Sequence, residues 1–302
     1  MTTRLFFQTA TVEPGVLAEY DRISSGLPPG WTARLLLDQS GGLGVAPRRS
    51  DEVVLFDGRE FAEWGFATFG PSLIPGHNHF ALLRAFPSEP AHDWYWCIDY
   101  DVRFTGDWRR FFDACSALTA DFLTCHVRTY ADEPDWSHWQ PLSHPVQSVP
   151  LAARLRSFNV VVRFSRRALG ALHDLHAAGW AGHHEVLIPT LLRAQGFDIA
   201  DIGGDGPFVP EGFRNRFYTS FSTLNGALEW LGTVRYRPPR AEAGRRRGAL
   251  YHPVKPAGSF PPTPRLDQAR QAIWELGRHL KWRMRRGAWG RITRPGPSEV
   301  RS

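Results

Sequence analysis

The sequence predicts an α/β fold in which a mostly parallel, twisted sheet is flanked by helices. Two observations predict it. Apolar segments of strand length alternate with amphipathic segments of helix length over the first two hundred residues, which is the pattern of βαβ units. The 302 residues are 42% hydrophobic and 13% aromatic, which suffices for a packed core in one large domain or two smaller ones.

The apolar patterns predict the following strands and helices. Residues 4–10 form the first strand, and residues 13–24 form a helix with Leu17, Tyr20 and Ile23 on one side. The further predicted strands are 32–39, 51–57, 94–101, 120–127, 157–165 and 197–203. The further predicted helices are 76–87, 107–118, 165–179 and 183–196. Asp57 and Asp107 are expected to cap the turn or helix that follows each of them.

The C-terminal third is less regular. The Arg-rich stretch 237–248 is expected to be a solvated loop, and residues 249–255 a short ordered segment. We therefore expect one domain at 1–255 that is large enough to be a catalytic domain. A linker and a basic tail with one helix at 267–286 follow it at 256–302.

Positive charge is concentrated in that tail. From Arg265 onward there are ten Arg or Lys against three Asp or Glu, whereas the whole chain has a net charge of +6. The body is therefore nearly neutral, which argues against a nucleic-acid-binding protein. The tail helix mixes Trp and Leu with Arg, so we expect peripheral contact with an anionic membrane; a helix packed on the body is the alternative.

Several classes of protein are disfavoured by what the sequence lacks. The three cysteines show no CxxC spacing, so we expect neither a disulfide framework nor a structural zinc site, but a reducing, cytoplasmic location, peripheral at the inner face of the membrane. No apolar run approaches the ~20 residues of a membrane span. There is no GxGxxG after the first strand and no GxxxxGK[ST], which disfavours nicotinamide, flavin and P-loop nucleotide sites.

The segment WYWCIDYDVRFTG, residues 94–106, contains a pair of carboxylates directly after a buried run. Asp99 and Asp101 are two residues apart, so in an extended chain they point to the same side, at the carboxyl edge of the sheet where open α/β folds bind ligands. Two adjacent carboxylates repel and favour a shared cation, and oxygen ligands select Mg²⁺ or Mn²⁺. Capping of the strand and its turn is the alternative interpretation.

The longer segment PGHNHFALLRAFPSEPAHDWYWCIDYDVRFTGDW, residues 75–108, resembles a family of GT-A-like glycosyltransferases from bacteria and fungi, and the resemblance continues more loosely over 157–200. These proteins carry a histidine-containing segment and then a YW-x-x-(D/E)-YDVRF-(T/S)-G motif. The resemblance implies a nucleotide-sugar donor and a divalent ion, Mn²⁺ or Mg²⁺. It implies that Asp101 binds the metal and that Asp99, where members often have Glu, contacts the ribose or donor sugar.

The same resemblance suggests further site residues. Glu185 begins a helix and would act as the base that activates an acceptor hydroxyl, with a simple helix-dipole contact as the alternative. His184 beside it would contact the acceptor. His77 and His79 lie in the matching segment and would line the donor site, although a lone histidine more often has a structural role.

Two more candidates lie outside the motif. The segment YHPVK places His252 and Lys255 where many GT-A enzymes supply a third metal ligand and a cation for the diphosphate; a surface turn is the alternative. Trp136 and Trp139 lie in a Pro-rich loop and would form a stacking platform for the acceptor, or else a small core under that loop.

These observations predict a metal-dependent bacterial glycosyltransferase that moves a sugar from a nucleotide-sugar donor to a hydroxyl of a glycan or lipid-linked acceptor, as in polysaccharide biosynthesis. With Glu185 as base, the reaction would invert the anomeric centre. Two alternatives stay open: an inactive GT-A-like domain that binds a glycan or partner, and an Asp-x-Asp phosphotransferase.

Overall fold

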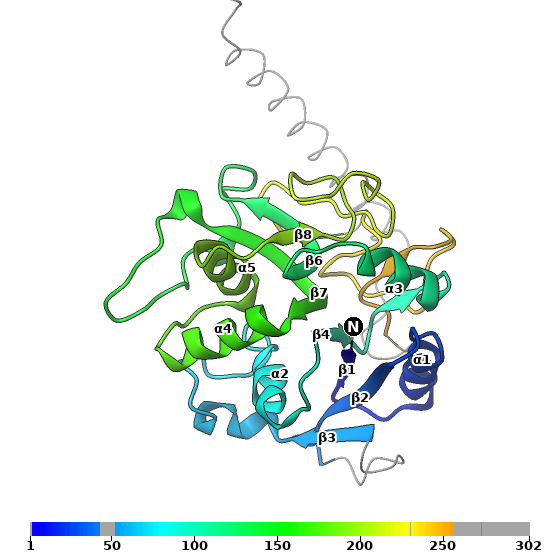
Figure 1. Cartoon of the computed structure of the whole chain (residues 1–302). Coiled ribbons are helices and arrows are strands. Elements are labelled where there is room, and N and C mark those ends of the chain that lie inside the picture. Colours follow the sequence, from blue (N-terminus) through cyan, green and yellow to red (C-terminus); the bar gives the residue numbers. More distant parts are fainter. Residues whose placement is uncertain (1, 43–51, 230, 256–272, 274–302) are drawn as a thin grey trace, which may run out of the picture.

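The computed structural model describes residues 2–42, 52–229, 231–255 and 273. Its main sheet has seven strands in the order β3-β2-β1-β4-β7-β6-β8 (Figure 1). Their bounds are β1 Thr3–Thr9, β2 Trp31–Asp38, β3 Val53–Phe56, β4 Trp94–Asp99, β6 Phe122–Thr129, β7 Leu155–Ser165 and β8 Ile199–Asp201. Only β7 runs against its neighbours among these strands, so the sheet is mostly parallel, as predicted.

Helices cover both faces of this sheet. The α-helices are α1 Pro14–Ser25, α2 Phe80–Ala85, α3 Trp108–Ser116, α4 Arg166–Ala177 and α5 His184–Ala194. Short 3₁₀ segments are η2 Gly58–Glu63, η3 Phe86–Ser88, η4 Ser137–Trp139 and η5 Leu151–Ala153. Figure 1 shows α2, α4 and α5 on one face and α1 and α3 on the other.

The central strand β4 explains why its sequence is apolar almost throughout. Tyr95 and Cys97 belong to the hydrophobic cluster under α2, α4 and α5, whereas Trp96 and Ile98 belong to the cluster under α1 and α3. Alternate residues of a strand point to opposite faces, so a strand covered on both sides needs apolar residues at every position. The run ends at Asp99, where the strand reaches the carboxyl edge.

Local signals explain several helix boundaries. Asp107 accepts a hydrogen bond from the backbone N–H of Arg109 and caps α3, and Asp57 does the same for Arg59 at the start of η2. Both caps confirm the predictions made for these residues. Ser165 caps α4 by accepting from the backbone N–H of Ala168.

The bounds of several expected elements differ from those in the structure. The helix expected at 76–87 is confined to Phe80–Ala85, and the strand expected at 157–165 begins at Leu155. None of residues 237–248 is buried and none lies in a named helix or strand, as expected of a solvated loop, and a β-bridge between Arg240 and Val254 anchors this loop. The tail at 256–302, which contains the membrane-binding helix expected at 267–286, lies outside the described residues apart from Ile273.

A second, two-stranded sheet matters for the site. It pairs β5, Arg103–Phe104, with β9, Leu250–Tyr251, in antiparallel register. Strand β5 begins two residues after Asp101, and β9 ends directly before His252. This pairing joins residues about 150 positions apart in the sequence, which is the long-range contact that assembles the polar group described next.

Candidate metal centre and active site

The carboxyl end of β4 brings the two aspartates to the edge of the sheet. The strand ends at Asp99, and the backbone N–H of Val102 donates to the carbonyl of Asp99 in the tight turn that follows. Asp101 is therefore held in a turn. The backbone N–H of Val254 donates to the Asp101 carbonyl at 2.8 Å, so the segment after β9 is anchored directly to this turn.

Asp99, Asp101 and His252 form a compact group. One ligand atom from each residue lies within 4.8 Å of the others, and Asp101 and His252 are buried. The Nε2 of His252 is 3.3 Å from Oδ1 of Asp101, and the Nζ of Lys255 is 3.4 Å from Oδ2 of the same carboxylate. The structure thus brings together the sequence-predicted metal ligands and the predicted diphosphate cation.

The orientation of His252 fits a metal ligand. Its Nδ1 lies 2.7 Å from the carbonyl oxygen of Arg235 and donates a hydrogen bond to it, which leaves Nε2 facing Asp101. Metal-bound histidines in proteins usually have their second ring nitrogen held in this way, because the hydrogen bond fixes the tautomer and the ring. Two carboxylates and one imidazole suit Mn²⁺, and Mg²⁺ with added water ligands.

The pKa values of the residues in this group are shifted from their ordinary values. Burial, together with the neighbouring Asp101 carboxylate, raises the pKa of Asp99 to about 7. Burial would also raise the pKa of Asp101, but His252 and Lys255 outweigh it and lower that pKa below its ordinary value. The pKa of His252 is raised, because the attraction of Asp101 exceeds the effect of burial. A bound cation would relieve the repulsion between the two carboxylates.

Glu185 lies in the first turn of α5, where His183 caps the helix: its Nδ1 accepts a hydrogen bond from the Glu185 backbone N–H. The Glu185 side chain is buried, and burial raises the pKa of its carboxyl group to about 7 despite the opposing charges of Arg156 and His252. A carboxyl poised near neutral pH is suited to accept a proton. The influence of His252 indicates that Glu185 lies within electrostatic range of the metal group.

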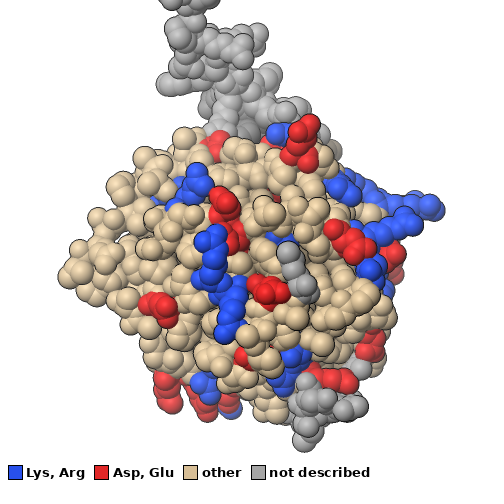
Figure 2. Space-filling model, viewed as in Figure 1, with Lys and Arg blue, Asp and Glu red and all other residues tan. Residues whose placement is uncertain are grey.

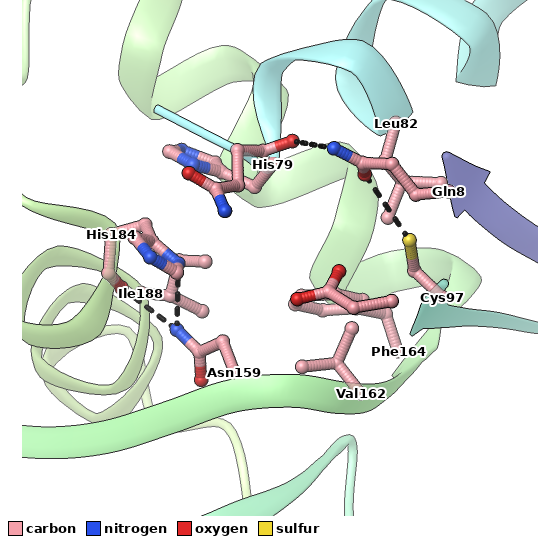
Figure 3. A pocket seen from close by; sticks show the side chains of 11 residues that line it. Gln8, His79, Leu82, Cys97, Asn159, Val162, Phe164, His184 and Ile188 are labelled. Carbon is pink, nitrogen blue, oxygen red and sulfur yellow. Dashed lines mark hydrogen bonds between the residues drawn. The ribbon is translucent and has the colours of Figure 1, made fainter. Parts of the chain in front are cut away.

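A small cavity adjoins the metal group (Figure 3). It has a volume of about 20 Å³ and is lined on its polar side by Gln8, Asn78, His79, Asp99, Asn159 and His184. Leu82, Val162, Phe164 and Ile188 supply apolar walls. Asp99 belongs both to this cavity and to the possible metal ligands, so the two features are continuous.

The two histidines of the motif segment, His77 and His79, lie in different surroundings in the structure. His77 donates from Nδ1 to the Ser72 carbonyl and accepts the backbone N–H of Phe69 at Nε2, so it fixes the loop before α2. His79, by contrast, lines the cavity. His184, predicted to contact the acceptor, lines the same cavity, and its Nδ1 lies 3.3 Å from Nδ2 of Asn159.

The structure corrects the prediction of an acceptor platform at Trp136 and Trp139. Their exposed fractions are only 6% and 2%, and the rings pack edge to face, 5.1 Å apart. The guanidinium of Arg156 covers Trp136, with Cζ 4.0 Å from the ring centroid. Buried rings have no face to offer a sugar, so these residues form the small core under the loop that was the alternative.

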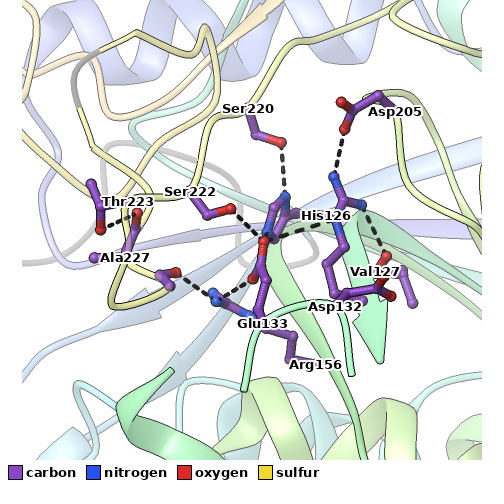
Figure 4. Close-up of polar contacts among 12 residues, drawn as sticks. His126, Val127, Asp132, Glu133, Arg156, Asp205, Ser220, Ser222, Thr223 and Ala227 are labelled. Atoms are coloured by element: carbon purple, nitrogen blue, oxygen red, sulfur yellow. Dashed lines mark hydrogen bonds and ion pairs between the residues drawn. The ribbon is translucent and has the colours of Figure 1, made fainter. Parts of the chain in front are cut away.

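A buried polar network near this loop was not predicted from the sequence (Figure 4). The carboxylate of Glu133 accepts from Arg156 at 2.8 Å and lies 3.1 Å from Nε2 of His126, and Ser222 donates to it as well. The His126 ring also contacts Ser220 through Nδ1 at 2.8 Å. These bonds tie the segment 220–226 to β6 and β7. Buried charges on separate segments leave no local sequence pattern, which is why they were missed.

A larger cleft of about 450 Å³ opens beside Lys255. Arg22 and Arg103 also line it, and Gly15 at the start of α1 forms part of its wall. Arg22 pairs with Glu19 at 2.7 Å and Lys255 lies 3.4 Å from Asp101, so nearby carboxylates balance much of the positive charge in the wall of this cleft. Elsewhere, Figure 2 shows charged side chains of both signs scattered among a larger uncharged area on the face in view.

No family model and no curated protein matches the chain. Among solved structures, the bifunctional IspDF from Campylobacter jejuni is similar at 11% identity and a TM-score of 0.37, over 67% of this chain and 49% of that one. A glucose-1-phosphate thymidylyltransferase from Bacillus anthracis, itself assigned provisionally, is similar at 10% identity and a TM-score of 0.36, over 67% and 86%.

A third structure is a glycosyltransferase involved in glycosylating the major capsid protein of PBCV-1. It is similar at 12% identity and a TM-score of 0.29, over 58% of this chain and 67% of that one. The chain spans about half the length of the Campylobacter protein. These are distant similarities to nucleotidyltransferase and glycosyltransferase structures, so the functional argument rests on the site itself.

None of the helices in the described part of the chain combines the length and the apolar character needed to cross a membrane. The three cysteines are free and buried.

Proposed function

We propose that this protein is a metal-dependent glycosyltransferase that moves a sugar from a nucleotide-sugar donor to a hydroxyl of an acceptor. The observation that carries the proposal is the grouping of Asp99, Asp101 and His252 within 4.8 Å at the carboxyl edge of a mostly parallel sheet, with Lys255 against Asp101. Nucleotides commonly bind at such an edge in open α/β folds.

Each residue of the site would have a separate role in the reaction. A divalent ion held by Asp101, His252 and Asp99 would supply positive charge for the diphosphate of the donor. Lys255 would add an ammonium beside that leaving group, and Arg22 and Arg103 line the cleft in which the nucleotide would lie. Asp99, on the side of the small cavity, would orient the sugar.

Glu185 would serve as the base. With its pKa near 7, its carboxylate can remove the proton of an acceptor hydroxyl as that oxygen attacks the anomeric carbon. The bond from the anomeric carbon to the diphosphate breaks, and the diphosphate leaves with its electron pair. Attack from the side opposite the leaving group inverts the anomeric centre. A glycan or lipid-linked acceptor and peripheral membrane contact through the tail remain part of the proposal.

The two alternatives differ in what they would bind. A phosphotransferase of the Asp-x-Asp type uses an aspartate as nucleophile on the first strand, whereas here the pair follows β4. An inactive domain would bind a glycan or partner without turnover. The raised pKa of the buried Glu185 favours the enzyme, because a buried carboxyl with a perturbed pKa in a site is a candidate for catalysis.

The test is binding and turnover by the full chain. UDP-, GDP-, dTDP- and CMP-sugars are titrated by calorimetry and thermal shift, with Mn²⁺ or with EDTA. We expect one nucleotide class to bind only with the metal, and Asp101→Asn to abolish that binding. Asp113→Asn on the exposed surface of α3 is the matched control and should bind like the wild type.

Turnover is measured as release of the free nucleotide in the presence of simple sugar and glycolipid acceptors. Glu185→Gln should keep donor binding and lose at least about 100-fold in turnover, since general base catalysis contributes about 10²–10⁴-fold. Failure of every nucleotide sugar to bind with either Mn²⁺ or Mg²⁺ would refute the proposal. Binding without turnover for any acceptor would favour the inactive domain.

A further inference from the structure

We propose that the small cavity beside Asp99 is a specificity pocket that receives a hydroxyl group of an uncharged donor sugar and excludes sugars that carry a carboxylate. This inference rests on the proposed function and extends it to the class of sugar. It is carried by the unsatisfied acceptors of the cavity, by its volume and by the charges around it.

A chain of hydrogen bonds fixes the tautomer of His79. The Nδ1 of His176 lies 3.0 Å from the carbonyl oxygen of Trp180, which can only accept, so this nitrogen carries a proton. In neutral His176 the Nε2 is then an acceptor. It lies 2.7 Å from Nε2 of His79, which must donate, and this leaves Nδ1 of His79 with a lone pair.

That lone pair has no partner among the described residues. His79 has an exposed fraction of only 7%, and its Nδ1 is buried without a hydrogen bond. The Oδ1 of Asn78 is likewise buried and unpartnered. Both residues line the cavity, but these two atoms have almost no accessible surface, so a donating ligand group in the cavity would satisfy them through a small movement of the two side chains. Buried acceptors without partners are uncommon and costly, and a ligand is one way to satisfy them.

The other polar side chains hold this arrangement in place. Asn159 uses its Oδ1 to accept from Thr124 and Ser157, and its Nδ2 to donate to the carbonyl of His184. The backbone carbonyl of Asn78 accepts from Gln8 at 3.0 Å, which holds the start of α2 against β1. Asn159 therefore acts as a positioning residue, whereas His79 and Asn78 offer free acceptors.

The charge and size of the cavity define the ligand. No Lys or Arg among the described residues lines it, and Asp99 is the one acidic group in its wall. Burial lowers the pKa of His79 well below its ordinary value and that of His184 to about 3, so both imidazoles are neutral at physiological pH. A carboxylate can only accept hydrogen bonds, and no cation in the wall would offset its charge beside Asp99, whereas a neutral hydroxyl can both donate and accept.

The volume of about 20 Å³ admits a group about the size of one water molecule, which matches one hydroxyl of a hexose. The position of the cavity beside the metal group also suits a donor sugar. Asp99 is shared with the metal group, so a sugar joined to a diphosphate at the metal would extend across Asp99 towards His79 and Asn78. His184 in the cavity wall is followed directly by Glu185, the proposed base.

The test uses the nucleotide class that binds in the experiment above. The affinities of the nucleoside diphosphate, its hexosyl ester and the matching uronosyl ester are measured by calorimetry with Mn²⁺. We expect the uronosyl ester to bind about 10-fold more weakly than the hexosyl ester, or worse, because a buried unpaired charge is penalised. Asn78→Ala should weaken the hexosyl ester by about 5-fold and leave the nucleoside diphosphate within 2-fold.

The nucleoside diphosphate reports whether the fold and the metal group are intact, and Gln147→Ala at an exposed amide is the matched control. Equal affinity for the hexosyl and uronosyl esters, or equal weakening of all ligands by Asn78→Ala, would overturn the specificity pocket while leaving the transferase proposal standing. Selective binding of a CMP-linked sialic acid, whose sugar carries a carboxylate, would also overturn it. Failure of every nucleotide to bind would refute the underlying function instead.

Discussion

Glu185→Gln should stabilise the fold at alkaline pH. The carboxyl has a pKa of about 7 in the folded protein against an ordinary 4.5, because burial penalises its charge. The folded state therefore binds more protons than the unfolded state between these values, so the stability of the wild type falls as pH rises from about 4.5 to about 7. At 1.36 kcal/mol for each pKa unit, the ionised carboxylate costs about 3 kcal/mol at pH 8.

Glutamine has a similar shape and carries no charge, so it avoids this cost. We expect the variant to be about as stable as the wild type at pH 4.5 and about 3 kcal/mol more stable at pH 8. For a domain of this size that corresponds to a rise in Tm of about 6–12 °C at pH 8. Urea unfolding followed by tryptophan fluorescence at both pH values, without metal or nucleotide, measures the difference.

Glu211→Gln, at an exposed carboxyl, is the control and should change little at either pH. Comparing variants isolates Glu185 from the other buried carboxyls that titrate in this range, such as Asp99 and Asp201, whose pKa values are raised to about 7 and about 6. A difference between Glu185→Gln and wild type that is the same at pH 4.5 and pH 8 would refute the reasoning.

Three further outcomes follow from the structure. His252→Gln should weaken Mn²⁺ binding by at least about 10-fold, measured by calorimetry, and unchanged affinity would remove this residue from the metal group. Glu133→Gln should cost about 3–5 kcal/mol in urea unfolding, because it leaves Arg156 buried without its partner; a cost below ~1 kcal/mol would contradict a paired charge. Gly226→Ala should cost about 2 kcal/mol or more, since its φ of +74° disfavours a side chain and a Cβ would lie 2.6 Å from that of Trp136; an unchanged urea midpoint would contradict this.

Local patterns predicted the aspartate pair, and long-range pairing completed its surroundings. The buried run before Asp99 identifies a central strand, and the spacing to Asp101 follows from the period of an extended chain. His252 and Lys255 were placed near the pair only by resemblance. Their approach depends on the pairing of β5 with β9, a contact between two-residue strands that no local periodicity reveals.

Other features could not be predicted for related reasons. The direction of β7 is not encoded in its apolar run, because a strand buried on both faces has the same composition whether parallel or antiparallel. Trp136 and Trp139 were compatible with either a loop platform or a core. The deciding contact is the Arg156 guanidinium stacked on Trp136, and Arg156 lies 20 residues further along the chain.

The Glu133–Arg156 pair also bears on the proposed base. Arg156 lowers the pKa of Glu185 by its charge, and the Glu133 carboxylate, paired with Arg156 at 2.8 Å, opposes that effect. Glu133→Gln should therefore expose Glu185 to a bare cation and lower its pKa. In the Glu133→Gln background, the extra stability that Glu185→Gln gives at pH 8 should shrink below about 3 kcal/mol. Urea unfolding of the double-variant set measures this, and an unchanged gain would show that Glu133 does not set the proton affinity of Glu185.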